Sequence, residues 1–309
     1  MILFCGYANV DVVARVPALP KGGDRVQATA IDHRHGGMGA NAAVAAARMG
    51  ARAAFGGAVG TAPADRDFLA ALAADGVDTS WCHTDAAVAT AVVLVTPDGE
   101  RAVISRDDDL DAARIAAGVR RLAARGGGWL YLDGYRWPGA ATALALADPG
   151  GRTSLFVDLD GCADPDAART ALSSAGHAVA GRAQLESLFG PVEDTAAELA
   201  AGHGVVLIVT DGADGWRLFG PGGETGRGAA FPVDAVDATG AGDCFSGAYL
   251  AGLDAGLAPA AAARRAAAAA ALSCTVPGAR GAPGRDAVEA LLSAPADPDR
   301  PPTPIRSTP

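Results

Sequence analysis

The sequence has 309 residues, of which 50% are hydrophobic and 19% are charged, a balance that allows a globular protein with a large buried core. The formal net charge of −10 at pH 7 argues against a nucleic-acid-binding protein, because such proteins normally carry a basic face. The five cysteines form no C-x-x-C pair, so the sequence indicates neither a zinc site nor a redox motif.

Targeting and membrane segments are not indicated either. Scattered single cysteines are typical of a reducing compartment. The first residues lack the basic region and the long apolar stretch of a signal peptide, and no run approaches the roughly 20 apolar residues of a membrane span. We therefore expect a cytoplasmic protein that has no membrane partner and no nucleic-acid partner.

Short apolar segments typical of strands alternate with alanine-rich segments typical of helices. Three of the strand segments are continuously apolar, as are strands buried on both faces of a parallel sheet. This alternation predicts an α/β fold with a central, mostly parallel sheet that is flanked by helices. The predicted strands are 2–5, 91–96, 102–105, 129–132, 154–158 and 205–210, and the predicted helices are approximately 40–49, 65–74, 111–124, 138–147 and 193–202.

One region interrupts the alternation. In residues 90–106, two apolar runs flank Pro97-Asp98-Gly99, which is a turn sequence and predicts a hairpin. Residues 10–35 also lack a helical period, so we expect a small β-sheet lid built from approximately 10–35 and 90–106. We assign residues 1–294 to one domain and expect the Pro- and Asp-rich residues 295–309 to form a disordered tail.

The segment Asp237-Ala238-Thr239-Gly240-Ala241-Gly242-Asp243 places a turn of small residues directly before a predicted helix. Free backbone N–H groups and the positive end of the helix dipole meet at such a start, and small residues let an anion approach closely. Asp243 has two interpretations. It is either a carboxylate that caps the helix, or a base that deprotonates a hydroxyl group beside the bound anion.

Three other segments carry candidate binding residues. Gly36-Gly37-Met38-Gly39-Ala40-Asn41 is a glycine-rich turn before a helix, and Asn41 offers both a donor and an acceptor to a polar ligand. Asn9 and Asp11 follow the first strand, where ligands bind in open α/β sheets, although both residue types are also ordinary turn formers. The segment 210–215 follows a buried strand and is either a nucleotide-binding turn or a simple loop.

The segments 36–41 and 237–243 resemble the two signatures of the ribokinase-like (PfkB) carbohydrate kinase family, in the same order and over residues 1–293 as a whole. The resemblance implies a ribokinase-like fold with a β-sheet lid, and transfer of the γ-phosphoryl group of MgATP to a primary hydroxyl of a sugar, ketose or acidic or phosphorylated sugar derivative. It implies that Asp243 is the catalytic base. The anion hole would then be formed by the amides of Gly240, Ala241 and Gly242.

The resemblance also implies the other ligand contacts and a homodimer formed through the lid. It implies a K⁺ ion near the anion hole, beside Asp237, Thr239 and the loop 276–281. The remaining implied residues are Asn9, Asp11, Gly36, Gly37 and Asn41 for the sugar, and Thr210, Gly212, Gly215 and Thr239 for ATP.

Three positions depart from the family pattern. Met38 stands where ribokinases have Lys, which weakens the case for ribose. The magnesium-linked Asn-x-x-Glu pattern is matched here by Gly181-Arg182-Ala183-Gln184, which lacks the acidic residue. Arg136 follows a central strand where ribokinases have an acidic residue, so it either binds an anionic group of the substrate or forms a structural ion pair.

Alternative functions remain at this stage. A nucleoside kinase of the same family would also use a primary hydroxyl group, and the altered Asn-x-x-Glu pattern allows a catalytically silent regulator that binds a sugar or nucleotide. A dinucleotide-dependent oxidoreductase is disfavoured, because Gly6 stands alone after the first strand in place of G-x-G-x-x-G. The Walker motif G-x-x-x-x-G-K-[ST] is absent from the sequence.

Overall fold

A central sheet of eight strands carries the architecture of the protein, for which a computed structural model describes residues 1–98 and 100–294. Six of the strands run parallel, and β11 and β12 extend one edge as antiparallel neighbours. In spatial order the strands are β12 (Gly223–Gly228), β11 (Trp216–Gly220), β10 (Val206–Thr210), β9 (His177–Gly181), β8 (Thr153–Asp158), β7 (Gly128–Asp133), β1 (Ile2–Cys5) and β4 (Ala53–Phe55).

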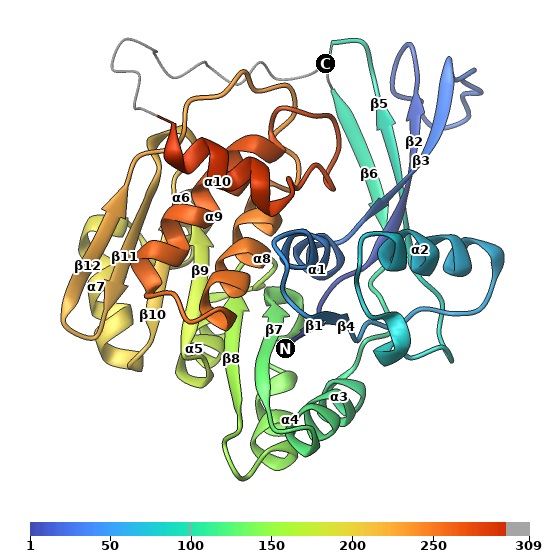
Figure 1. Ribbon diagram of the computed structural model, residues 1–309. Helices are drawn as coiled ribbons and strands as arrows, with labels where there is room; N and C mark the ends of the chain where they lie inside the picture. Colours follow the sequence, from blue (N-terminus) through green and yellow to red (C-terminus); the bar gives the residue numbers. More distant parts are fainter. Residues whose placement is uncertain (99, 295–309) are drawn as a thin grey trace.

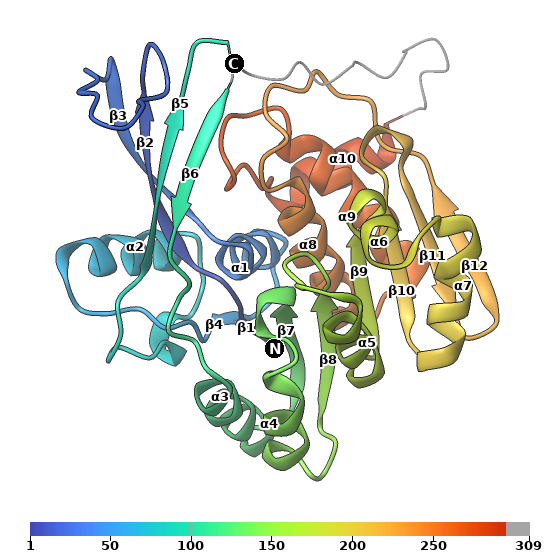
Figure 2. The same ribbon diagram turned by 180° about the vertical axis from the view of Figure 1, so that it is seen from behind.

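Helices cover both faces of this sheet (Figures 1 and 2). Successive side chains of a strand point to opposite faces, so Ile2 and Phe4 of β1 belong to one core and Leu3 and Cys5 to the other. The first core contains side chains of α1 (Met38–Arg48), α2 (Pro63–Ala74), α8 (Ala241–Asp254), α9 (Pro259–Ser273) and α10 (Arg285–Ser293). The second contains side chains of α3 (Ala112–Ala124), α4 (Ala140–Ala147), α5 (Pro165–Ser174), α6 (Arg182–Phe189) and α7 (Val192–His203).

A second sheet of four strands projects from the body as the lid (Figure 1). Its strand order is β3 (Ala30–Gly36), β2 (Asn9–Arg15), β5 (Ala89–Val95) and β6 (Arg101–Ser105). Strand β2 pairs in parallel with β5, and the outer pairs are antiparallel. A short connection joins the base of the lid to the body, because β3 ends at Gly36, two residues before α1 begins.

The predicted ribokinase-like α/β fold with a small lid is confirmed. Each predicted strand and helix has a counterpart whose ends differ by at most two residues. Strands β4, β9, β11 and β12 were not predicted individually, because they are short or rich in Ala and Gly, and their neighbours in the sheet determine the strand conformation. The predicted tail 295–309 lies outside the described residues. No helix within the described ranges is long and apolar enough to cross a membrane.

Candidate active site

Helix α8 begins at Ala241, directly after a tight turn at Gly240. Gly240 has a φ of 76°, in the left-handed region that favours glycine, and a Cβ atom there would lie 2.3 Å from the carbonyl oxygen of Ala279. Asp243 lies in the first turn of α8, and its Oδ2 accepts a hydrogen bond of 2.8 Å from Asn41 Nδ2. The interpretation of Asp243 as the helix cap is therefore wrong, because Gly240 occupies that position and the carboxylate faces α1.

The surroundings of Asp243 make its carboxyl group less acidic. Burial raises its pKa to about 7, the hydrogen bond from Asn41 opposes the shift, and the negative charges of Asp160 and Asp133 add to it. A carboxylate with a pKa near neutrality can accept a proton from an alcohol more readily than an ordinary aspartate does. The arrangement therefore suits general base chemistry.

The glycine-rich turn before α1 closes against the first strand of the lid. A Cβ atom at Gly37, whose φ is 95°, would lie 2.4 Å from the Cα atom of Ala8, so only glycine fits without strain. A Cβ atom at Gly36 would lie 2.6 Å from Asn9 Oδ1 and 2.9 Å from Asp11 Oδ2. Asn9 Nδ2 in turn donates to Asp11 Oδ1 at 2.6 Å. The four predicted substrate residues at 9, 11, 36 and 37 thus form one cluster.

Two cavities meet beside the start of α8. The larger has a volume of about 450 Å³ and a mostly apolar wall, and the smaller has a volume of about 180 Å³. Thr210 and Gly242 line both of them, so the cavities adjoin there. The larger cavity also contains the predicted nucleotide residues Gly212 and Gly215, while Asp243 lines the smaller one.

Carboxylates dominate the polar wall of the smaller cavity. Asp158, at the end of β8, and the exposed Asp160 line it together with Asp243. Asp158 is held in place because its Oδ2 accepts from Ser246 Oγ of α8 at 2.9 Å, and its Oδ1 accepts from the Asp160 amide at 3.1 Å. Burial, together with the charges of Asp243 and Asp160, raises the pKa of Asp158 well above its ordinary value. A cation in this cavity would relieve that mutual repulsion.

The residues that match the Asn-x-x-Glu pattern line the same small cavity. Gly181, the last residue of β9, and Gln184, in the first turn of α6, both line it. The two positions therefore line the same cavity as Asp243, but neither supplies a carboxylate. In the part of the chain that the structure describes, no group of three or more His, Cys, Asp or Glu side chains is arranged to hold a metal ion alone.

Asp237 ties the turn before α8 to the loop that follows α9. Its Oδ1 accepts from the Thr239 amide and its Oδ2 accepts from the Gly278 amide, each at 2.9 Å. The amide of Ala241 donates to the carbonyl oxygen of Ala238 at 3.1 Å, so one of the three predicted anion-hole amides already has a protein partner.

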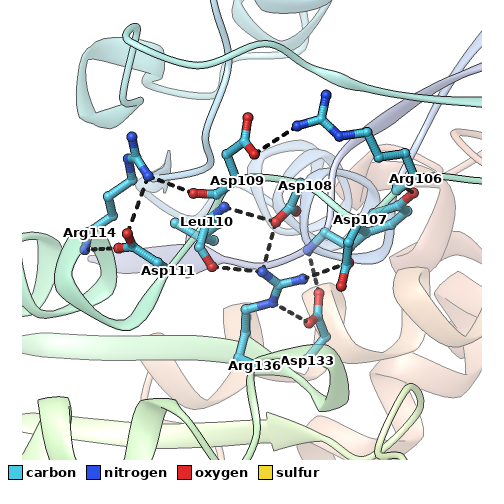
Figure 3. A network of polar contacts seen from close by, with 10 residues as sticks. Arg106, Asp107, Asp108, Asp109, Leu110, Asp111, Arg114, Asp133 and Arg136 are labelled. Carbon is cyan, nitrogen blue, oxygen red and sulfur yellow. Dashed lines mark hydrogen bonds and ion pairs between the residues drawn. The ribbon is translucent and has the colours of Figure 1, made fainter.

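Arg136 lies in a buried ion-pair network and not on an open substrate surface (Figure 3). Its guanidinium group contacts Asp108 Oδ1 at 2.7 Å, Asp133 Oδ1 at 3.3 Å and the carbonyl oxygen of Leu110 at 2.8 Å. The side chain of Arg136 is only 4% exposed, and those of Asp108 and Asp133 are 1% and 0% exposed. The structural ion pair is therefore the interpretation that this geometry supports, and the predicted contact with an anionic substrate is corrected accordingly.

Two residues of the small cavity, Asp158 and Asp160, were missed by the sequence analysis. A signal for them was present, because Asp158 ends a predicted strand and Asp160 follows it two residues later, just as Asp11 follows the predicted first strand after a short loop. Ligands of open α/β sheets bind at the carboxyl ends of the strands. The same argument that selected Asp11 could have selected this pair.

The chain is similar to known proteins over most of its length. The family described as pfkB family carbohydrate kinase matches residues 1–284. A ribokinase of Bacillus subtilis (strain 168) is 31% identical over 302 residues, which cover 94% of this chain and 99% of that protein. An ATP-dependent ribose-1-phosphate kinase of Halopiger xanaduensis is 31% identical over 305 residues, which cover 94% and 98%.

Solved structures show the same architecture. The structure of an Arabidopsis thaliana ribokinase complexed with ribose and ATP superposes with a TM-score of 0.81 at 26% sequence identity, covering 95% of this chain and 99% of that one.

Proposed function

Because the chain belongs to the pfkB family of carbohydrate kinases, we propose that it transfers the γ-phosphoryl group of ATP to a primary hydroxyl group of a neutral sugar or related polyol. Membership of this family makes the protein a phosphotransferase with an alcohol group as acceptor. The single observation that carries the proposal is the place of Asp243, in the first turn of α8 beside two adjoining cavities.

The larger cavity is the proposed site of the nucleotide base. Apolar and small residues dominate its wall, which suits a planar ring, and Trp216, Phe231 and Phe245 contribute aromatic surface. The phosphates would then extend past Thr210 and Gly242 toward the smaller cavity. The related Arabidopsis ribokinase was solved with ATP and ribose, which supports a nucleotide as co-substrate here.

The acceptor is proposed to be neutral because of the chemistry of the predicted substrate residues. Asn9, Asp11 and Asn41 offer amide and carboxylate groups that can bind sugar hydroxyls. The arginine that an anionic acceptor would have favoured, Arg136, is already neutralised by Asp108 and Asp133. Closure of the lid would exclude water, which otherwise competes with the sugar as the acceptor.

In the proposed mechanism, the carboxylate of Asp243 accepts the proton of the primary hydroxyl as its oxygen attacks the γ-phosphorus atom. The bond from that phosphorus to the bridging oxygen of ADP breaks, and ADP leaves with the electron pair. Amides at the start of α8 stabilise the negative charge that develops on the phosphoryl oxygens. We expect the amides of Gly240 and Gly242 to contribute more than that of Ala241, which already donates to Ala238.

Magnesium would be held on the β8 side of the small cavity. Asp158 and Asp160 supply the carboxylate oxygens that Mg²⁺ prefers, and this ion commonly uses only one or two protein carboxylates together with phosphate oxygens. When bound, Mg²⁺ neutralises phosphate charge. Because Asp158 and Asp160 are available to hold the metal, we favour an active enzyme over a catalytically silent regulator. A K⁺ ion beside Asp237, Thr239 and the loop 276–281 remains part of the proposal.

The test is an ADP-release assay with MgATP and K⁺ over a panel of ribose, fructose, other hexoses, sugar acids, ribose 1-phosphate and nucleosides. We expect the highest kcat/KM with a neutral sugar, and a loss of about a thousandfold in Asp243→Asn with ATP binding retained. A preference for a nucleoside or for an anionic sugar would contradict the proposal that the acceptor is a neutral sugar. Activity that survives in Asp243→Asn would contradict the role of the base.

The lid is also proposed to join two copies of the chain. Ile31, Val92 and Ile104 lie on one face of the lid and are between 37% and 70% exposed, and β3 and β6 are the outer strands of its sheet. Exposed apolar side chains beside edge strands favour association with another sheet. A second lid of the same chain would cover them in a homodimer.

A further inference from the structure

The amide of Asn41 is held from both sides by charged residues far away in the sequence. Its Nδ2 donates to Asp243 Oδ2 at 2.8 Å, and its Oδ1 accepts from Arg280 Nε at 3.2 Å. Asn41 itself is 5% exposed. The three side chains therefore form a continuous hydrogen-bonded chain from the loop after α9, through α1, to the first turn of α8.

Arg280 is unusual among the described arginines because its buried charge has no close carboxylate partner. Its guanidinium carbon lies 4.9 Å from the ring centre of Phe68, and its two terminal nitrogens are buried without a hydrogen bond among the described residues. Burial lowers the pKa of Arg280 to about 10, with Arg48 adding to the shift and Asp75 opposing it, so the group stays charged at neutral pH. A buried cation without a paired anion is costly, and a packing role alone would be served by an apolar side chain.

The loop that carries Arg280 is fixed in position by its backbone. Arg48 Nη1 donates to the carbonyl oxygens of Arg280 and Ala282 at 2.9 and 2.6 Å. The carbonyl oxygen of the preceding Ala279 lies against Gly240, where an added Cβ atom would approach it to 2.3 Å. The loop that holds the guanidinium group against Asn41 therefore also packs on the turn before α8.

A carboxamide has two orientations that differ in which end is the donor. With the orientation seen here, the N–H group faces the carboxylate of Asp243 and the oxygen faces the guanidinium. The reversed orientation would place oxygen against the carboxylate and N–H against N–H. Arg280 therefore selects the orientation in which Asn41 donates to Asp243. A positive charge at the far end of the amide also polarises that donor.

From this geometry we infer that Arg280 is a positioning residue of the phosphoryl transfer, which acts through Asn41 to hold and orient the carboxylate of Asp243. The inference rests on the proposed function, in which Asp243 is the base. It concerns a residue that does not reach the reacting atoms itself. Other groups that act on Asp243 are Asp158 and Asp160 at β8, and Asp133 and Tyr131 of β7.

A double-mutant cycle tests the inference with Arg280→Met, Asn41→Ala and their combination. We expect Arg280→Met to lower kcat roughly tenfold, the effect of one lost hydrogen bond, while KM for ATP changes by less than about twofold. In the Asn41→Ala background the same substitution should change kcat by less than about twofold. Arg280→Lys keeps a donor on a chain of similar length and should recover most of the activity. Arg285→Met is the control, because Arg285 Nε donates to the carbonyl oxygen of Met49 and contacts neither Asn41 nor Asp243 among the described residues.

The outcomes separate the inference from the function on which it rests. If wild type phosphorylates no sugar, the proposed function fails. If wild type is active but Arg280→Met costs the same factor with and without Asn41, the inference is overturned. It is also overturned if Arg280→Lys is as slow as Arg280→Met. Should Arg280→Met fail to fold in a thermal melt, a tenfold loss in a folded Arg280→Lys would overturn it as well.

Discussion

The carboxylate of Asp108 and the guanidinium group of Arg136 lie 2.7 Å apart, and both side chains are almost completely buried. Asp108 belongs to the segment that leaves the lid after β6, whereas Arg136 follows β7 in the centre of the main sheet (Figure 3). Asp133, at the end of β7, completes the contact. The pair therefore fastens the base of the lid to the body.

Removal of the arginine should destabilise the whole fold. Arg136→Met leaves Asp108 and Asp133 buried without a counter-charge, so we expect the free energy of unfolding to fall by about 3–5 kcal/mol. Urea unfolding followed by circular dichroism measures it. Arg106→Met is the matched control, since Arg106 is 72% exposed in its ion pair with Asp109 and should change stability by less than about 1 kcal/mol. Equal effects of the two substitutions would contradict the structural role of Arg136.

The activity should fall on the acid side of neutrality, because the pKa of Asp243 is raised. Only the ionised carboxylate of Asp243 can accept a proton, and burial raises its pKa to about 7. Lowering the pH through 7 therefore removes the base, and kcat/KM at limiting MgATP should fall tenfold per pH unit on the acid side. A nucleotide-binding titration over the same range is the control and should change little. A profile that stays flat down to pH 5 would show that the free enzyme's base has an ordinary pKa.

The Mg²⁺ concentration that the enzyme requires should change when a carboxylate is added to or removed from the small cavity. Gln184→Glu restores a carboxylate beside Asp158 and Asp160, so we expect a lower Mg²⁺ concentration for half-maximal rate, whereas Asp160→Asn should raise it roughly tenfold. Binding of Mn²⁺ in the presence of ADP, followed by electron paramagnetic resonance, measures the same change without turnover. Asp166→Asn, at a side chain that is 97% exposed, is the control. Unchanged metal binding in Asp160→Asn would remove Asp160 from the site.

Association through the lid should be sensitive to a charge on its apolar surface. Ile104 is 70% exposed on β6, so Ile104→Asp should convert a homodimer to a monomer in light scattering coupled to size exclusion. Leu146→Asp is the matched control, because Leu146 is 76% exposed on α4, away from the lid sheet, and should leave the mass unchanged. A wild-type protein that is monomeric at all accessible concentrations would contradict the proposed dimer.

Local signals in the sequence determined most of the fold and the centre of the candidate site. Apolar runs and alanine-rich runs predict strands and helices because burial and periodicity act over a few residues. The turn 240–242 and the glycines at 36 and 37 could be interpreted directly, because a tight turn before a helix needs small residues and leaves amides free. Asp243 could therefore be selected as the candidate base from sequence.

Only the tertiary structure decided which partners these residues have. Asn41 and Asp243 are 202 positions apart, and Asn41 and Arg280 are 239 apart, so no local pattern could reveal that one amide joins them. The same holds for Arg136, whose partner Asp108 comes from the segment after the lid. A charged side chain in the sequence indicates only that the group needs a partner or water. The packing of distant segments determines which partner it contacts. For Asp243 that packing supplies the burial and the nearby carboxylates that raise its pKa toward neutrality, and also the Asn41 donor, which opposes that shift.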